Sequence, residues 1–464
     1  MSKKQEYVHP YIPNSAPKVK AEMMKDIGIS DIDELYEDIP EHLRFKGKMN
    51  IPGPVLSEVD LKKEINRILA KNSNVEEYIS FLGGGTAQHY VPAICDEVIG
   101  RSEFLTAYAG EPYEDHGRFQ ALFEYESLMA ELLDVDVVNV PTYDWGQAVS
   151  TSIRMAGRIA KRDEMLVSEA ISPDRMKILK NYCEPVMKIT IVAHDPVSGK
   201  LDINDLKNKW SDKVAGVYFE NPTYFGVIQD HGQDIADLVH QNNGVVVVGV
   251  DPSSLGILTP PSGYGADITC GDIQSLGNHM YFGGILGGFI ATRDEEKYVM
   301  EYPSRLFGIC KTEVEGEWGF GDVAYDRTSF GVREKGKEFI GTAAALYGIS
   351  TAVYLSLMGP KGMQELGQHL VQKARYTMES LSKINGVAIK FASPHFKEFV
   401  VDFSGTGKPY SQINKALLEQ KIFGGKDLTA DFPELKNCAL FCVTEMISKQ
   451  DIDTMVEALK TVIG

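Results

Sequence analysis

Long apolar runs, cysteine and positive charge are all scarce in this sequence. No apolar run approaches the length needed to cross a membrane, and the first residues lack the apolar core of a signal peptide. Lysine and arginine number 47 against 65 aspartate and glutamate residues, a formal net charge of −18. This balance argues against a nucleic acid or an anionic membrane as partner, because phosphate would be repelled. We therefore expect a cytoplasmic protein.

The six cysteines are scattered along 464 residues and predict no disulfide framework. Only Cys438 and Cys442 lie close together, in a CxxxC spacing without further ligands nearby. Buried free thiols explain this pair better than a metal site does. We predict no metal in this protein.

The chain is too long for one small core, and 43% hydrophobic residues with 24% charge are typical of a soluble globular protein. We predict a proline-punctuated N-terminal arm over residues 1–75, a large α/β domain over 76–340 and a smaller α/β domain over 341–464. An arm of this kind seldom forms a core alone, so we expect it to contact a partner.

Short apolar strands alternate with amphipathic helices through the predicted large domain. The expected strands cover Val135–Val140, Met165–Ser168, Val186–Val192, Val214–Phe219 and Val245–Val250. The expected helices cover Gly117–Asp134, Ala148–Lys161, Pro173–Asn181, Ile203–Trp210 and Asp234–Asn242. This alternation predicts right-handed crossovers and a mostly parallel sheet with helices on both faces.

The stretch Gly244–Thr292 carries the main clue to function. Its Val-rich run ends at Asp251, where α/β sheets place ligands. An enzyme that uses pyridoxal phosphate needs an acid for the pyridinium nitrogen, a lysine for the Schiff base and donors for the phosphate. Asp251 fits the acid, but the polar turn Gln274–His279 holds no lysine.

Three other polar segments are candidate anion sites. Gly83–Gly85 allows close approach of backbone amides to an anion, or forms a plain tight turn. Asp144–Gln147 opens a helix after a strand and could hold a phosphate on exposed amides. Arg333, Lys335 and Lys337 form the densest basic cluster, which either captures an anion or is a solvated loop.

Several ordered motifs resemble the α subunit of the decarboxylating glycine dehydrogenases, the P-proteins of the glycine cleavage system. The resemblance runs from Tyr11 to the C-terminus. The motifs are FLGGGTAQHYVP from Phe81, RSEFLTAY from Arg101, GRFQALFEY from Gly117, VDPSSLG from Val250, GDIQSLGN from Gly271 and VREK from Val332.

The resemblance implies a fold-type I (aspartate-aminotransferase-like) pyridoxal-phosphate fold. It also implies a lysine-bearing β subunit that mainly holds the cofactor, a lipoyl carrier protein as acceptor and an α2β2 heterotetramer. Asn278 stands where the Schiff-base lysine is expected, so no catalytic residue is predicted in this chain. The residues that the matching motifs offer as cofactor contacts are His89, Tyr108, Asp251, Asn278, Arg333 and Lys335.

Three loops depart from the family pattern, at residues 109–117, 144–148 and 336–342. A diverged subunit that processes another amino acid or amine, or a non-catalytic scaffold, is therefore an alternative to a glycine decarboxylase subunit. A self-sufficient aminotransferase-like enzyme would need a different lysine, such as Lys335 or Lys337.

Overall fold

The computed structural model describes residues 8–9, 11–53, 55, 57–105, 118–303, 305–338, 340 and 344–464. The chain divides into two compact units, Met1–Asn72 and Ser73–Gly464. The predicted boundary between a large and a small domain near residue 340 falls inside the second unit and stays a prediction.

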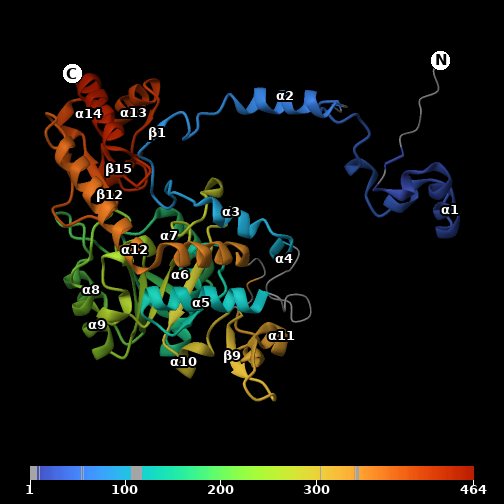
Figure 1. The fold of residues 1–464 in the computed structure, drawn as a ribbon, viewed down its shortest axis with the longest axis horizontal. Helices are drawn as coiled ribbons and strands as arrows, with labels where there is room; N and C mark the ends of the chain where they lie inside the picture. Colours follow the sequence, from blue (N-terminus) through green and yellow to red (C-terminus); the bar gives the residue numbers. More distant parts are fainter. Residues whose placement is uncertain are drawn as a thin grey trace. The chain divides into compact units, whose positions relative to one another are not determined.

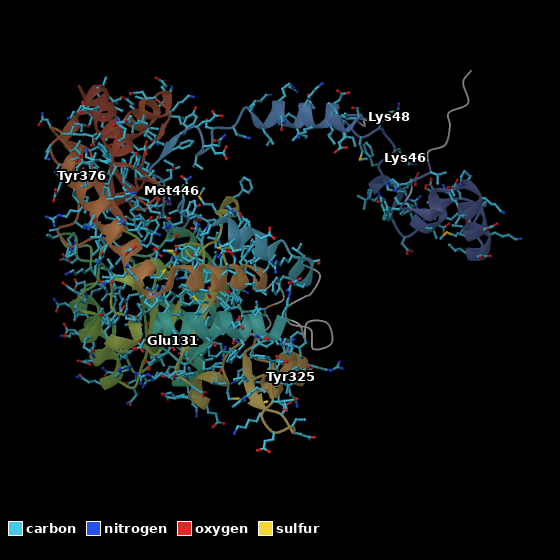
Figure 2. All side chains as sticks on the ribbon, in the orientation of Figure 1. Lys46, Lys48, Glu131, Tyr325, Tyr376 and Met446 are labelled. Atoms are coloured by element: carbon cyan, nitrogen blue, oxygen red, sulfur yellow. The ribbon has the colours of Figure 1, made fainter. Side chains whose placement is uncertain are left out.

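The first unit is helical, and none of its described residues is buried (Figures 1 and 2). Its α-helices are α1 (Pro17–Ile27) and α2 (Glu58–Leu69), and neither contains a buried residue. Ser57 caps α2, since its hydroxyl accepts from the amide of Asp60 at 3.4 Å. The hydrophobic effect within this unit therefore contributes little to its order.

A seven-stranded sheet forms the centre of the second unit, in the order β2-β8-β7-β6-β5-β3-β4. The five strands from β7 to β4 are parallel. At one edge β8 runs antiparallel to β7, and β2 pairs antiparallel with β8. The strands are β2 (Val137–Val138), β3 (Glu164–Ser168), β4 (Lys188–Val192), β5 (Val214–Glu220), β6 (Val245–Gly249), β7 (Ile268–Asp272) and β8 (Gly288–Thr292). The predicted parallel α/β architecture is confirmed.

The valine run of β6 is buried on both faces of the sheet, which explains its lack of polar alternation. Val245 and Val247 belong to one hydrophobic core cluster, and Val246 and Val248 belong to another. Successive side chains of a strand point to opposite faces, so these two clusters are the two layers that cover the sheet.

Helices cover both faces of this sheet (Figure 1). On one face, α6 (Trp145–Ala160), α7 (Pro173–Cys183) and α10 (Glu296–Val299) supply residues to the core cluster of Val245 and Val247, and on the other α8 (Ile203–Lys209) and α9 (Gly232–Gln241) supply residues to that of Val246 and Val248. The other helices of this part of the chain are α3 (Ala93–Ile99), α4 (Ser102–Leu105), α5 (Phe119–Leu133) and α11 (Ser329–Val332). A hairpin of β9 (Phe307–Lys311) and β10 (Trp318–Asp322), which periodicity did not predict, precedes α11.

The C-terminal part packs around a four-stranded antiparallel sheet, in the order β11-β12-β15-β14. Its elements are α12 (Ala345–Leu381), β11 (Ala388–Ile389), β12 (Glu398–Asp402), α13 (Tyr410–Glu419), β13 (Ile422–Phe423), β14 (Lys426–Asp427), β15 (Cys438–Cys442) and α14 (Lys449–Ile463). Cys438 and Cys442, at the two ends of β15, are free and buried, as predicted. The short strand β1 (Ile79–Ser80) pairs with β13 and ties the start of this unit to its end.

The long helix α12 is interrupted at Gly359. Gly359 has a φ of 58°, and Pro360 follows it inside the helix. Proline lacks the amide donor and a left-handed residue redirects the chain, so the axis changes direction here. Within the described residues no helix has the length and apolar character needed to cross a membrane.

Candidate functional site

A cavity of about 600 Å³, including its opening, lies at the carboxyl ends of the parallel strands. Three acidic residues reach it from three neighbouring strands: Glu220 ends β5, Asp251 follows β6 and Asp272 ends β7. Carboxyl ends of parallel strands share one edge of a sheet, which is why residues far apart in sequence meet here. The predicted place of the site is thus a real cavity.

Lys397, which precedes β12, neutralises Asp251 inside this cavity. Its Nζ lies 2.5 Å from Asp251 Oδ2, and both side chains are largely buried. Oδ1 accepts hydrogen bonds from the amide and hydroxyl of Ser253 and from the hydroxyl of Ser275. Burial raises the pKa of Asp251, but the adjacent ammonium outweighs burial and holds the pKa well below its usual range. Asp251 therefore has a permanent partner from its own chain.

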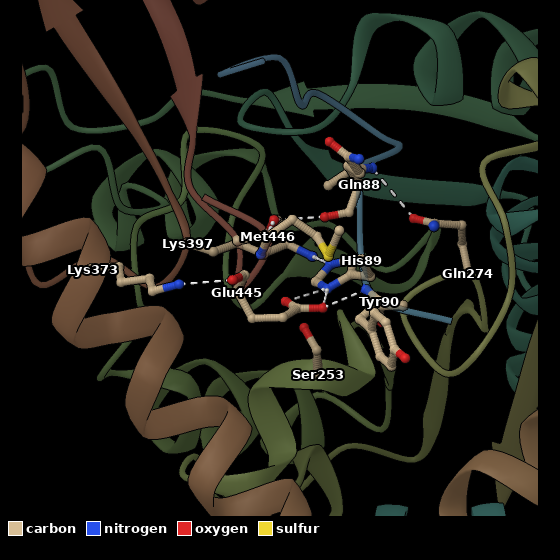
Figure 3. A network of polar contacts seen from close by, with 12 residues as sticks. Gln88, His89, Tyr90, Ser253, Gln274, Lys373, Lys397, Glu445 and Met446 are labelled. Carbon is tan, nitrogen blue, oxygen red and sulfur yellow. Dashed lines mark hydrogen bonds and ion pairs between the residues drawn. The ribbon is translucent and has the colours of Figure 1, made fainter. Parts of the chain in front are cut away.

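His89 extends this ion pair into the network of Figure 3. Lys397 Nζ lies 2.9 Å from His89 Nε2, and His89 Nδ1 lies 2.9 Å from Glu445 Oε2. A lysine ammonium can only donate, so Nε2 accepts and Nδ1–H donates to the carboxylate. Burial raises the pKa of Glu445, but the hydrogen bond from His89 and other interactions lower it to about 2. The network joins the segment after β1 to the segment after β15.

Asn278, at the expected lysine position, is part of the fold and not of the cavity lining. Its side chain is buried, and Nδ2 donates to the carbonyl of Ile273 and to the hydroxyl of Thr351, each at 3.0 Å. Thr351 lies on α12 and itself donates to the carbonyl of Leu276 at 3.1 Å. The amide therefore ties the turn after β7 to α12.

Replacing Asn278 with alanine is expected to lower the free energy of unfolding by about 1–3 kcal/mol. The change removes one of the two donors to the carbonyl of Ile273, which keeps the amide of Leu276, and the donor to the buried hydroxyl of Thr351. Urea unfolding followed by far-ultraviolet circular dichroism measures this loss. Ser262→Ala is the control, because Ser262 donates a single, partly buried hydrogen bond to the carbonyl of Leu133. Equal losses in the two variants would contradict the structural role of Asn278.

The two glycine-containing turns have anionic partners from within the chain. The amide of Gly84 donates to Glu398 Oε1 at 2.7 Å. At the start of α6, Asp144 Oδ1 accepts from the amide of Gln147 at 2.8 Å. Each carboxylate already accepts from a backbone amide of its turn, and a negative charge at either turn would repel a phosphate.

Arg175 faces the cavity but is paired with Glu220. Its Nε and Nη2 donate to the two carboxylate oxygens, each at 2.8 Å, and the guanidinium lies 4.1 Å from the ring centre of Trp145. Tyr218 donates to Glu220 Oε1 at 2.9 Å. This bidentate pair occupies the Nε–Nη2 edge of the guanidinium.

Asp272 differs from the other acidic residues of the cavity. Burial raises its pKa to about 7, and the nearby carboxylate of Asp251 adds to the rise. Its Oδ1 accepts from the amide of Gln274 at 3.0 Å. Among the described residues, no ion pair involving Asp272 is present.

Some predicted contact residues lie elsewhere. Arg333 and Lys335 are exposed and do not line the cavity, and Lys337 pairs with Glu301. Tyr108 and the loop 109–117 lie outside the described residues, as does part of the loop 336–342. As contacts to a cofactor held by another subunit, Tyr108, Arg333 and Lys335 stay predictions.

The family model described as "Glycine cleavage system P-protein" matches residues 9–459. The chain belongs to this family. The probable glycine dehydrogenase (decarboxylating) subunit 1 of Pyrococcus furiosus is 40% identical over 458 residues, covering 98% of this chain and 99% of the relative. That of Saccharolobus islandicus is 38% identical over 462 residues, covering 99% of both chains.

Solved structures agree with this assignment. A glycine decarboxylase (P-protein) of the glycine cleavage system in inhibitor-bound form is 31% identical, with a TM-score of 0.84 over 98% of this chain and 100% of that chain. A glutamate decarboxylase of Lactobacillus brevis, 11% identical with a TM-score of 0.68 over 90% of this chain and 95% of that chain, shares the fold alone. The fold is therefore fold-type I, the architecture of pyridoxal-phosphate enzymes, as predicted.

The residues present do not fit pyridoxal phosphate as a cofactor of this P-protein chain. The acid that would face the pyridinium nitrogen is bound to Lys397, and Asn278 cannot form a Schiff base. The amides that would hold the phosphate face Asp144 and Glu398. The acid and one amide of each glycine-containing turn are thus already paired within the chain, and the Schiff-base lysine is absent.

Sequence reasoning missed the residues that fill the cavity. Lys397, Arg175, Glu220, Asp272 and Glu398 were not candidates, although all line it. Glu220 and Asp272 each end a buried apolar strand. The argument that selected Asp251, a polar residue at the carboxyl end of such a strand, could have selected them as well. No local signal marks Lys397, because its partner lies in another sheet.

Proposed function

We propose that this P-protein chain is the non-lysine-bearing α subunit of a pyridoxal-phosphate-dependent glycine decarboxylase. A β subunit supplies the lysine and holds the cofactor, the pair decarboxylates glycine, and the aminomethyl group passes to a lipoyl carrier protein. The observation that carries this proposal is the Asp251–Lys397 ion pair beside a turn with Asn278 in place of lysine. A chain that fills its own cofactor site needs a second chain for catalysis.

The N-terminal unit supports a partner subunit. Leu61, Ile65, Ile68 and Leu69 of α2 are exposed and recur at helical spacing, so they form one apolar stripe. A helix of 12 residues is marginal in water without packing of such a stripe. A second subunit that covers α2 would order it, in keeping with an α2β2 assembly.

Co-expression with the lysine-bearing subunit of the same genome tests the proposed function. We expect the chain alone to be colourless with added pyridoxal phosphate, and the complex to show internal-aldimine absorbance. The complex should also exchange labelled bicarbonate into the carboxyl carbon of glycine. Aldimine absorbance in the lone chain that Lys335→Ala removes would contradict the proposal.

A diverged subunit that acts on another amino acid is the second candidate. The loop 336–342 departs from the family pattern, and its Glu338 is buried, accepting from Arg158 Nη1 at 2.9 Å and lying 3.2 Å from Arg154 Nε. Two arginine side chains of helix α6, Arg154 and Arg158, thus hold the changed loop through Glu338. A coloured complex without glycine exchange that turns over another amine would favour this candidate, and a colourless, inactive complex would favour a scaffold.

A further inference from the structure

The loop His279–Gly287, between the turn after β7 and strand β8, presents an aromatic ring to solvent. Phe282 at its tip is fully exposed. Among the described residues from Ser73 onward, it is the only exposed phenylalanine. A single exposed apolar residue needs no explanation, but this one stands on an unusual backbone.

The backbone of this loop is strained. Tyr281, Phe282 and Ile285 have φ angles of 43°, 57° and 49°, in the left-handed region that residues other than glycine seldom adopt. A β-branched residue such as Ile285 is a particular outlier there. Strained residues persist only where their surroundings determine the conformation, and they concentrate at sites of binding or catalysis.

Contacts on three sides hold the loop rigid. The ring of Tyr281 stacks on Tyr347 of α12 with centroids 4.5 Å apart. His279 Nε2 lies 3.0 Å from Asp96 Oδ1 of α3, and the amide of Gly287 donates to the carbonyl of Tyr143 at 2.9 Å. These contacts fix the loop but leave the ring of Phe282 uncovered.

The loop borders the mouth of the cavity. A Cβ built on Gly283 would lie 4.0 Å from the hydroxyl of Thr86, which lines the cavity, and one on Gly284 would lie 3.4 Å from the hydroxyl of Tyr143. Tyr143 is exposed, as is Ile94 on α3, the helix that holds His279. Tyr143 and Phe282 are here called the mouth patch.

We infer that Phe282 is the aromatic anchor by which this chain docks onto its partner subunit at the mouth patch. The inference rests on the proposed function. A rigid aromatic side chain gives binding energy with little loss of conformational entropy, so a pre-ordered ring is typical of an interface hot spot. The ring of Phe282 is not part of the core clusters that surround the cavity. The strained backbone of the loop therefore does not serve to pack this ring within the chain.

The partner subunit is the occupant that the other observations favour. The full-length relatives are named as subunit 1 of an enzyme, which implies another subunit. Lys397 lines the cavity behind the mouth patch and pairs with its acid, so a partner that covers the mouth would not block a cofactor site of this chain. The exposed apolar stripe of α2 is a second surface that the partner subunit could cover.

Sedimentation of the full-length chain with the co-expressed lysine-bearing subunit tests the anchor. Phe282→Ala is expected to weaken association roughly thirty-fold or more, the range of interface hot spots. Phe282→Gly should weaken it equally and raise the melting temperature, since glycine adopts a φ of 57° without strain. Phe282→Tyr should keep most of the affinity.

Trp318→Ala is the matched control, an exposed aromatic residue on the β9–β10 hairpin, and is expected to change association less than about threefold. Wild-type complex formation with unchanged affinity of Phe282→Ala would overturn the anchor and leave the proposed function intact. Equal losses in Trp318→Ala, or an effect of Phe282→Ala on self-association of the chain alone, would also overturn it. A wild-type chain that fails to bind the lysine-bearing subunit would overturn both proposals.

Discussion

Replacing Lys397 with methionine is expected to lower the free energy of unfolding by about 3–5 kcal/mol at pH 7. The change leaves the buried carboxylate of Asp251 without the ammonium that lies 2.5 Å away, and an uncompensated buried charge is strongly destabilising. It also removes the donor to His89 Nε2. Urea unfolding of the full chain measures the loss.

Two further variants separate the charge from the packing. In Lys397→Met with Asp251→Asn no charge is left unpaired, so the double variant should lose several kcal/mol less than the sum of the two single variants. Lys390→Met is the control, because Lys390 and Asp402 form a part-exposed pair at 4.0 Å. This variant should lose less than about 1 kcal/mol of unfolding free energy. A Lys397→Met loss as small as that of the control would contradict the buried pair.

The strands and helices of this P-protein chain could be predicted where one short-range pattern determines them. The valine run of β6 and the capped helix α2 follow from burial on two faces and from Ser57. The β9–β10 hairpin was missed, because its strand Trp318–Asp322 alternates glycine with larger residues and has little apolar periodicity. Hairpins of this kind depend on packing against other elements.

The candidate site shows the same limit. Asp251 and Asn278 could be selected from the sequence, because each occupies a fixed place relative to a buried strand. What their side chains do could not be predicted, since Lys397 and Thr351 come from distant elements. The sequence shows that position 278 holds no lysine. Only the fold shows that a different lysine, Lys397, is the counter-ion of Asp251.

Replacing Asp272 with asparagine is expected to stabilise the protein at high pH and to change its pH dependence. The folded-state pKa of about 7 exceeds the unfolded value of about 3.9, so the folded state holds the proton more tightly. The stability from this group is full below pH 4 and is lost as the pH rises to about 7. Asparagine does not titrate, and it keeps an oxygen to accept from the amide of Gln274.

The gain should therefore grow with pH, to about 4 kcal/mol at pH 8, because each unit of pKa difference corresponds to about 1.4 kcal/mol. Urea unfolding of both proteins at pH 5 and pH 8 should show a difference that increases by about 3 kcal/mol. Titration of Glu445, whose pKa is lowered to about 2, affects both proteins equally and cancels. Asp212→Asn, an exposed control, should show no such increase. A pH-independent difference for Asp272→Asn would mean that Asp272 is ionised across this range and that Arg175 or Lys397 compensates its charge.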